Sequence, residues 1–384
     1  MYLFIVDALV NITLMNIILF FTYGVSLKNW KSSGLFDREI KLYKHLSKNH
    51  DLNITFVTYG DEGDLIYSDE IPEIEIVPLY KYFKNFNNKI LNLFYSLFIG
   101  FKLKTILKKE KSLIKTNQLW GSWVAIIFKI VTNNLLIVRT GYDLISFKKK
   151  ENKSNFIIFF YYLLTHLSLI FSNFYLVSSK ADQEFLMNSK LVHKKKIELM
   201  PNWVSVSQIN YDSPRKDIIA VGRLEHQKNF EYLIKSFANS DKKINLVGDG
   251  TLKIKLEMMA KNLNCNVNFL GKMSNREVLG LIAKHKYYIL TSHYEGNPKS
   301  LLEAMSAGCI VIAPNNKNIA EIIKNGFNGF IYSSEIDDLN KLIDKLDSMD
   351  LFEVKKNAFE YVKTNNSLEK ISEKEVEIYK KALG

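Results

Sequence analysis

Two glutamates flank the start of a helix-like segment in "HYEGNPKSLLEAMSAG", residues 293–308. Glu295 lies in a loop-like stretch, and Pro298 stands at an expected first helical position. The amides of the following turn would lack partners inside the helix, and such amides bind anions. Glu303 lies one turn further, on the same face as Lys299. Two carboxylates there could accept hydrogen bonds from sugar hydroxyls while the amides bind phosphate, an arrangement that suits a nucleotide sugar. The structural alternative is that Glu303 complements the helix dipole and Glu295 is a solvated loop acid.

A second candidate site is "AVGRLEHQKNFEYLIKSF", residues 220–237. A strand-like run ends at Gly222, Arg223 follows, and Lys228 precedes the next helical pattern. A forked guanidinium and a mobile ammonium near a helix N-terminus could clamp a diphosphate, although two solvated loop cations would give the same pattern. Residues 248–250, "GDG", lack the third glycine of a dinucleotide fingerprint. This argues against the interpretation of the protein as a nicotinamide oxidoreductase.

The formal net charge of +12 lies mostly in the first 200 residues. This favours an anionic partner: a phospholipid surface, a phosphorylated substrate or nucleic acid. An AT-rich coding bias toward lysine is the other explanation, and we see no arginine-rich or aromatic motif for nucleic acid. Cys265 and Cys309 provide neither a disulfide framework nor metal-ligand spacing, so we expect a reducing compartment.

Short apolar runs alternate with helical patterns, which predicts an α/β protein with parallel sheets. In the first half we expect strands at 17–21, 54–58, 74–77, 113–115, 135–138 and 174–177. In the second half we expect them at 217–221, 244–247, 267–270, 287–290 and 310–313. We infer two doubly wound domains, 1–200 and 201–366, whose ligands bind at the carboxyl ends of strands.

The ends of the chain need separate interpretations. The apolar stretch 1–24 resembles neither a signal peptide nor a clean spanning helix, and residues 1–14 of it would be an extension before the first strand. The polar, aperiodic segment 200–217 is the best domain boundary. Residues 367–384 read as a charged helix that either packs back across this boundary or forms a solvated tail.

Four ordered motifs in the second half carry a family resemblance: "VGRLEHQKN", "LVGDG", "FLGKMSNREV" and "EGNPKSLLEAMSAGCIVIAPNNKNIAEII". Together they resemble the retaining glycosyltransferases of the GT-B fold, family 4 (glycosyl transferases group 1). The first half resembles them more loosely, through "MNIILFFTYG", the loop at Gly34, "RTGYDLISF" and "LVSSKADQEFL". The resemblance implies two Rossmann-like domains facing a central cleft.

The resemblance also implies roles for individual residues. Arg223 and Lys228 would hold the donor diphosphate, Glu295 would approach the transferred sugar, and Glu303 would bind the ribose hydroxyls. The donor base would lie near Lys272 and Met273. Further donor contacts would come from Gly34, Gly222, Asn297, Pro298, Lys299, Ser300 and Leu301.

The implied mechanism is a same-face displacement with retention, in which the leaving phosphate helps to deprotonate the acceptor. It differs from the paired carboxylates of retaining hydrolases. No metal or cofactor is expected, because the two cations replace magnesium; the donor would be a hexose-type sugar on UDP or GDP.

The sequence departs from the family where many members carry a histidine, since that loop reads "RTGYD", residues 139–143. Arg139, Tyr142 or Asp143 could take over the role, as could the nearby "TNQLWG". Trp120 and Tyr142 could stack on an acceptor sugar, although aromatic residues are more often part of the core.

Residues 88–109, "NKILNLFYSLFIGFKLKTILKK", place six large apolar residues on one helical stripe flanked by lysines. This pattern suits a helix lying in an anionic membrane surface, but a helix packed on the sheet would share it. Residues 156–171 are apolar nearly all round and read as buried or interfacial.

We therefore expect a glycosyltransferase for cell-surface polysaccharide such as lipopolysaccharide, acting on a glycan or lipid-linked acceptor. It would be cytoplasmic and peripheral at the inner face of the plasma membrane. The alternative is a catalytically weakened GT-B protein that binds a nucleotide sugar without turnover.

Overall fold

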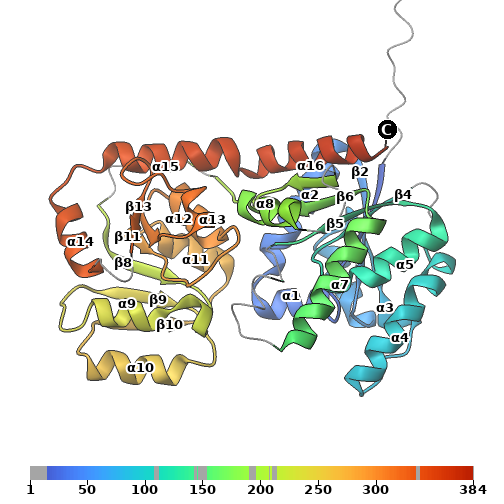
Figure 1. Ribbon diagram of the computed structural model, residues 1–384, viewed down its shortest axis with the longest axis horizontal. Coiled ribbons are helices and arrows are strands. Elements are labelled where there is room, and N and C mark those ends of the chain that lie inside the picture. Colours follow the sequence, from blue (N-terminus) through green and yellow to red (C-terminus); the bar gives the residue numbers. More distant parts are fainter. Residues whose placement is uncertain are drawn as a thin grey trace, which may run out of the picture. The chain divides into compact units, whose positions relative to one another are not determined.

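The computed structural model describes residues 15–107, 112–141, 145, 154–189, 196–206, 208–209, 214–333 and 338–383. The chain divides into two compact units (Figure 1). Unit 1 contains residues 1–140, 162–175 and 376–384, and unit 2 contains residues 141–161 and 176–375. Residues 1–14, which we expect to be an extension, lie outside the described residues.

The first sheet has seven strands in the order β3-β2-β1-β4-β5-β6-β7. Its central strands are apolar runs with both faces buried, as parallel sheets require; in β1, residues 17–20 are all at most 2% exposed. The strands are β1 (Met15–Phe20), β2 (Leu52–Thr58), β3 (Ile74–Pro78), β4 (Ser112–Thr116), β5 (Leu135–Arg139), β6 (Phe174–Val177) and β7 (Ile197–Leu199).

Helical segments connect these strands. They are α1 (Leu27–Ser33), α2 (Phe36–His50), η1 (Glu62–Asp69), α3 (Leu79–Tyr82), α4 (Lys89–Lys102), η2 (Leu103–Thr105), α5 (Ser122–Thr132), α7 (Asn155–Phe171) and α8 (Lys180–Asn188).

The second sheet has six strands in the order β10-β9-β8-β11-β12-β13. They are β8 (Lys216–Val221), β9 (Ile244–Val247), β10 (Val267–Gly271), β11 (His285–Ile289), β12 (Ile310–Pro314) and β13 (Phe330–Tyr332). The helices are η4 (His226–Lys228), α9 (Phe230–Ser236), α10 (Lys253–Asn262), α11 (Asn275–Ile282), α12 (Lys299–Ser306), α13 (Lys317–Ala320), α14 (Leu339–Asp347), α15 (Phe352–Asn365) and α16 (Leu368–Leu383).

Helices cover both faces of the second sheet because successive strand residues point to opposite sides. Ile218 packs in a core cluster with Leu233 of α9 and Leu256 of α10. Its neighbour Ile219 belongs to a different cluster with Leu302 of α12. The predicted doubly wound α/β architecture is therefore confirmed.

All eleven predicted strands are present, with ends that differ by at most two residues. The three-residue strands β7 and β13 were not predicted, because such short runs carry no periodic signal. The end of α16 belongs to unit 1, where Lys115 Nζ donates to Tyr379 Oη at 3.1 Å in a buried contact.

Candidate functional site

The candidate donor site lies at the carboxyl ends of β8 and β11. These strands are parallel neighbours, although β9 and β10 come between them in the chain. The connection after β8 leads to β9 on one side, and the connection after β11 leads to β12 on the other. This makes the position a topological switch point, where open α/β sheets bind ligands. Residues 222–228 follow β8, and residues 290–298 follow β11.

Lys228 and Glu295 connect the two loops through a salt bridge. Lys228 Nζ lies 2.5 Å from Glu295 Oε1, and the side chains are only 15% and 9% exposed. Low exposure strengthens such a contact relative to a surface pair. The sequence analysis assigned both residues to the site, and the structure brings their charged groups into direct contact.

Further hydrogen bonds hold the two loops in register. Thr291 Oγ1 donates to the Lys228 carbonyl at 2.7 Å. The His293 amide donates to the Gln227 carbonyl at 2.9 Å, and Gln227 Nε2 donates to the Tyr294 carbonyl at 3.0 Å. Gln227 Oε1 also lies 3.4 Å from Arg223 NH2. The two cations and Glu295 are thus carried by one connected loop pair.

Two glycines allow the loops after β8 and β9 to approach closely. A Cβ on Gly248, whose φ is 148°, would lie 1.8 Å from the Gly222 carbonyl oxygen. A Cβ on Gly222 would lie 3.2 Å from the Lys228 side-chain methylenes. The first glycine of the "GDG" motif therefore allows the backbones of these two loops to lie close together beside the site.

Glu225 ties the same two loops together from the other side. Its carboxylate accepts from the Thr251 amide at 3.1 Å and from the Thr251 hydroxyl at 2.8 Å. These two hydrogen bonds favour the charged form, so the pKa of Glu225 is lowered.

Glu303 lies on α12 with 6% of its surface exposed, and it accepts a hydrogen bond from Asn275 Nδ2 at 3.1 Å. Asn275 begins α11, directly after the loop that contains Lys272 and Met273. Lys272 is exposed and Met273 is half-buried against the core. The loop expected to hold the donor base therefore leads directly into Asn275, the helix residue that orients Glu303.

The start of α12 differs from our prediction in two details. The helix begins at Lys299, one position later than expected, and Pro298 is its extended N-cap residue with ψ 107°. The amides of Leu301 and Leu302, expected to be open to an anion, instead donate to the Pro298 carbonyl at 3.2 and 3.3 Å. The first turn is tightened, which leaves less of it for phosphate binding.

The other predicted residues of α12 and its preceding loop have structural partners. Asn202 binds both the side chain and the carbonyl of Asn297, at 2.9 and 2.6 Å. The Lys299 ammonium lies 3.8 Å from the centroid of the Trp203 ring.

Ser300 Oγ accepts from the hydroxyl of Tyr288 at 2.7 Å. Burial raises the pKa of Tyr288, so its hydroxyl remains protonated and donates this hydrogen bond.

The candidate residues of the first half of the chain lie at several different elements. Gly34 ends α1 in the left-handed conformation, with φ 74°, directly before the long helix α2. Arg139 ends β5 and is 7% exposed. Trp120 follows β4, with its ring centroid 5.2 Å from that of Trp123. Tyr142 and Asp143 lie outside the described residues.

Sequence reasoning missed three polar residues that orient the site. Gln227 and Asn318 bind the carbonyls of Tyr294 and Glu295, the latter at 2.7 Å, and Asn275 binds Glu303. Only Asn275 had a recognisable signal: "SNRE" is a capping box that places it at the first helical position. Among the described residues, no group of three or more His, Cys, Asp or Glu could hold a metal ion.

Comparison with known proteins agrees with this architecture. Residues 203–364 match the family model described as glycosyl transferases group 1. With its two parallel sheets the chain has the GT-B fold, and over residues 203–364 it is similar to the glycosyl transferases group 1 family.

Two curated relatives illustrate the similarity. A Campylobacter jejuni protein named N-acetylgalactosamine-N,N'-diacetylbacillosaminyl-diphospho-undecaprenol 4-alpha-N-acetylgalactosaminyltransferase is 29% identical over 182 residues, 45% of this chain and 50% of that protein. Staphylococcus aureus CapH, named a capsular polysaccharide biosynthesis glycosyltransferase, is 26% identical over 320 residues, 78% of this chain and 80% of that one. The chain therefore spans only half the length of the Campylobacter relative it matches.

Solved structures show the same fold at low identity. Anabaena HepE, solved in complex with UDP and glucose, has a TM-score of 0.74 at 17% identity, covering 96% of this chain and 100% of its own. Sucrose-phosphate synthase from Thermosynechococcus elongatus has a TM-score of 0.77 at 15% identity, covering 96% and 99%.

Proposed function

We propose that the protein transfers a hexose-type sugar, with retention, from a nucleoside diphosphate donor to a glycan or lipid-linked acceptor. The observation that carries this proposal is the Lys228–Glu295 salt bridge at the switch point of the second sheet, with Glu303 on the adjoining helix. Lys228 supplies a cation for a diphosphate, and Glu295 and Glu303 supply carboxylates for sugar hydroxyls. All three lie beyond the carboxyl ends of neighbouring strands. The family match of residues 203–364 supports the same activity.

In the proposed reaction, the bond from the anomeric carbon to the diphosphate oxygen breaks as the acceptor oxygen bonds to that carbon on the same face. The acceptor proton passes to the departing phosphate oxygen. Arg223 and Lys228 stabilise the charge that develops on the diphosphate, so no metal is required. Glu295 holds the sugar, and catalysis is chiefly positioning.

The donor and acceptor classes are also proposals. HepE, a structural neighbour, was solved with UDP and glucose, which supports a UDP-type donor over GDP. The Campylobacter relative is named for a diphospho-undecaprenol substrate, and CapH for capsular polysaccharide, which supports a lipid-linked acceptor in cell-surface polysaccharide synthesis.

A membrane-bound acceptor fits the surface of α4. The six apolar residues of its stripe point to solvent, between 41% and 68% exposed: Ile90, Leu91, Phe94, Leu97, Phe98 and Phe101. The opposite face packs on α5, where Trp123 Nε1 donates to Ser96 Oγ at 2.9 Å. The stripe is therefore not the face by which the helix packs, which was the competing interpretation.

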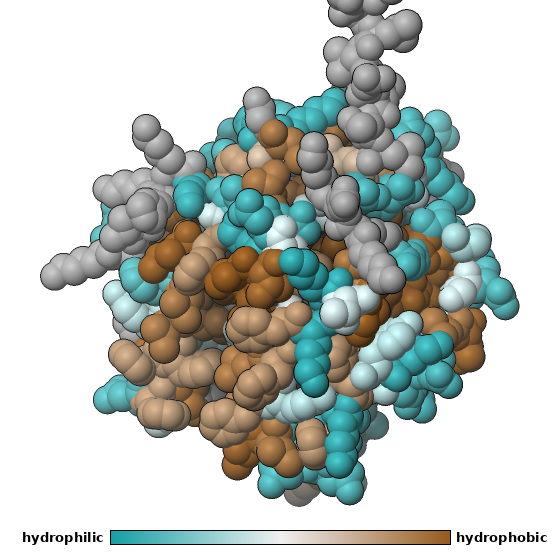
Figure 2. Space-filling view, turned by 90° about the vertical axis from the view of Figure 1, so that its right-hand side faces the viewer, coloured by the Kyte–Doolittle hydropathy of each residue, from teal (hydrophilic) through white to brown (hydrophobic). Residues whose placement is uncertain are grey.

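Unit 1 extends this apolar surface beyond α4. Figure 2 looks at the side that carries α4 and α5, and apolar side chains cover much of it. Ile130 of α5 and Tyr162, Leu163 and Ile170 of α7 are each more than 40% exposed. So large an exposed apolar area on one unit typically marks an interaction surface.

An anionic bilayer is the occupant that we propose for this surface. Lys89, Lys102 and Lys104 are exposed at the ends of the stripe, and residues 88–107 contain no acid. Apolar side chains between lysines match acyl chains beneath anionic head groups. In the part of the chain that the structure describes, no helix is long and apolar enough to cross a membrane. We therefore propose peripheral attachment at the cytoplasmic face.

A nucleotide panel tests the proposed transfer activity. Thermal unfolding would be followed in EDTA with UDP, GDP, ADP or NAD, for wild type and Glu303→Ala. A ligand at 100 times its dissociation constant adds about 2.7 kcal/mol of stability. Stabilisation of wild type alone by one nucleoside diphosphate supports the site. Stabilisation by NAD alone, or by none of the four, would contradict it.

A further inference from the structure

A cavity lined largely by charged residues lies in unit 2, away from the candidate donor site. Its volume is about 250 Å³, and its wall includes residues at the amino ends of β8 and β11 and just before β9. The donor loops follow the carboxyl ends of these strands, so the cavity lies at the other end of the same strands. It is lined by Arg215, Lys216, Asp217, Ile218, Lys242, Lys243, Lys286, Tyr287, Ile343 and Asp347.

Positive charge dominates this cavity. Five of its ten lining residues are cations and two are acids. The cations come from separate segments around β8, β9 and β11, so the fold collects them from distant parts of the sequence. Clustered cations with too few acids raise the local potential and attract anions.

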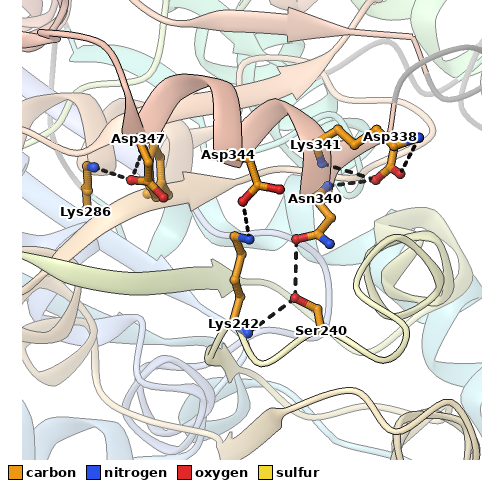
Figure 3. A network of polar contacts seen from close by, with 9 residues as sticks. Ser240, Lys242, Lys286, Asp338, Asn340, Lys341, Asp344 and Asp347 are labelled. Atoms are coloured by element: carbon orange, nitrogen blue, oxygen red, sulfur yellow. Dashed lines mark hydrogen bonds and ion pairs between the residues drawn. The ribbon is translucent and has the colours of Figure 1, made fainter.

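Carboxylates of α14 hold two of the lysines in place (Figure 3). Lys242 Nζ lies 2.6 Å from Asp344 Oδ1. Lys286 Nζ contacts Asp347 Oδ1, which also accepts from the Tyr287 hydroxyl at 2.8 Å. These contacts fix the two ammonium groups at the wall, which lowers the entropy cost of ordering them around a ligand.

Arg215 Nη1 donates to the Ala307 carbonyl at 2.6 Å. Two exposed lysines of the cavity are less completely balanced. Lys243 Nζ is 4.0 Å from Asp217, and Lys216 forms no ion pair with the described residues. Lys355 of α15 lies near the cavity's cations: burial first, and then Arg215 and Lys286, lower its pKa. Because these neighbouring cations repel one another, a bound anion would stabilise their charged forms.

The backbone at the rim is also unusual. Asp217 has φ 62°, the left-handed region, although it lies within β8 and carries a side chain. Such conformations are costly and often occur at binding sites.

We propose that this cavity binds the phosphoryl group of a small phosphorylated solute, at a site distinct from the donor site. A guanidinium and several ammonium groups are the donors that bind phosphate in proteins. The cavity is large enough for a diphosphate or a sugar phosphate. The fraction of unit 2 that carries this ligand would then depend on the concentration of a phosphorylated metabolite.

The experiment titrates inorganic pyrophosphate into the full chain by calorimetry at low salt. The pocket variant is Lys216→Gln with Lys243→Gln, two exposed lysines whose removal leaves the held pairs intact. The control variant, Lys255→Gln with Lys370→Gln, loses the same charge from exposed ion pairs elsewhere in unit 2. A third variant, Lys228→Ala, removes a cation of the donor site.

We expect the pocket variant to bind pyrophosphate at least about tenfold more weakly, since two charge-assisted contacts are lost. The control variant and Lys228→Ala should retain a wild-type pocket phase. Equal affinity in the pocket and control variants would overturn the proposal, as would loss of all binding in Lys228→Ala alone. Anionic vesicles form the last arm: weaker vesicle binding in the pocket variant, with pyrophosphate binding unchanged, would assign the cavity to lipid head groups and overturn the small-solute proposal.

Discussion

Lys228 and Glu295 are 67 positions apart in the chain, yet their side chains form a 2.5 Å salt bridge between the loops after two neighbouring strands. The pair places the proposed diphosphate cation and the proposed sugar carboxylate in direct contact. Each charge is held by the other, so the contact fixes the position of one loop against the other.

Replacing Lys228 by alanine should reduce sugar transfer by roughly 100-fold or more, since a donor aimed at developing charge is lost. The same change leaves Glu295 without its cation at low exposure, so we also expect a loss of about 1–3 kcal/mol in unfolding free energy. The control is Lys255→Ala, an exposed ion-pair lysine on α10. Similar transfer rates in both variants would rule out the clamp.

Glu303→Ala should weaken nucleoside diphosphate binding by about 1–3 kcal/mol, because hydroxyl contacts would be left unpaired. Asn275→Ala, which removes the hydrogen bond to Glu303, should produce a smaller loss in the same direction. Calorimetric titration with the stabilising nucleotide measures both. Glu257→Ala, an exposed acid of α10, serves as the control. Unchanged affinity in Glu303→Ala would remove this residue from the site.

How far the sequence could predict this site depends on the kind of contact. Loops at the carboxyl ends of parallel strands were predictable, because apolar runs and helical patterns alternate regularly. The Lys228–Glu295 contact depends on β8 and β11 being neighbours, which strand order decides and periodicity does not report. Periodicity likewise identified the apolar stripe of α4 but not its exposure, because that depends on which face α5 covers.

Exchanging Phe94 and Phe98 for glutamine should lower vesicle binding at every salt concentration. Both rings are 61% exposed, and transfer of each into lipid contributes roughly 1–3 kcal/mol. Lys89→Gln with Lys102→Gln should weaken binding to anionic vesicles only, by about 1 kcal/mol per lysine, and less at high salt.

Sedimentation with neutral and anionic vesicles distinguishes these cases. Ile254→Gln with Met258→Gln is the matched control, since these residues are 72% and 61% exposed on α10. If both double apolar variants sediment like wild type, bilayer contact through α4 is refuted. A dimer that dissociates only in the phenylalanine variant would instead assign the surface to a second copy of the chain.

The Glu225–Thr251 contact predicts a specific pH dependence. Since the pKa of Glu225 is lowered in the folded protein, its carboxylate stabilises the fold at pH values above the unfolded pKa. That contribution is lost as the pH falls through the lower folded pKa. The difference in unfolding free energy between wild type and Glu225→Gln should therefore be constant near neutrality and shrink on acidification below about pH 4.5. Urea unfolding at a series of pH values measures it, and a difference that does not shrink as the pH is lowered would contradict the assigned contact.

Gly248→Ala tests the close approach of the loops after β8 and β9. Its Cβ would lie 1.8 Å from the Gly222 carbonyl oxygen, and the residue would keep a φ of 148°. Neither the backbone of Gly222 nor that of Gly248 can yield without moving the loop that carries Arg223 and Lys228. We expect a loss of roughly 2–5 kcal/mol and weaker nucleotide binding together.

Gly271→Ala is the control, because its φ is 71° but nothing lies within 4 Å of the added Cβ. Only about 1–2 kcal/mol of backbone strain is therefore expected, and the hydrogen bond from the Gly248 amide to the Gly271 carbonyl can remain. Equal effects of the two substitutions on stability would mean that the contact between the loops contributes nothing beyond the left-handed backbone.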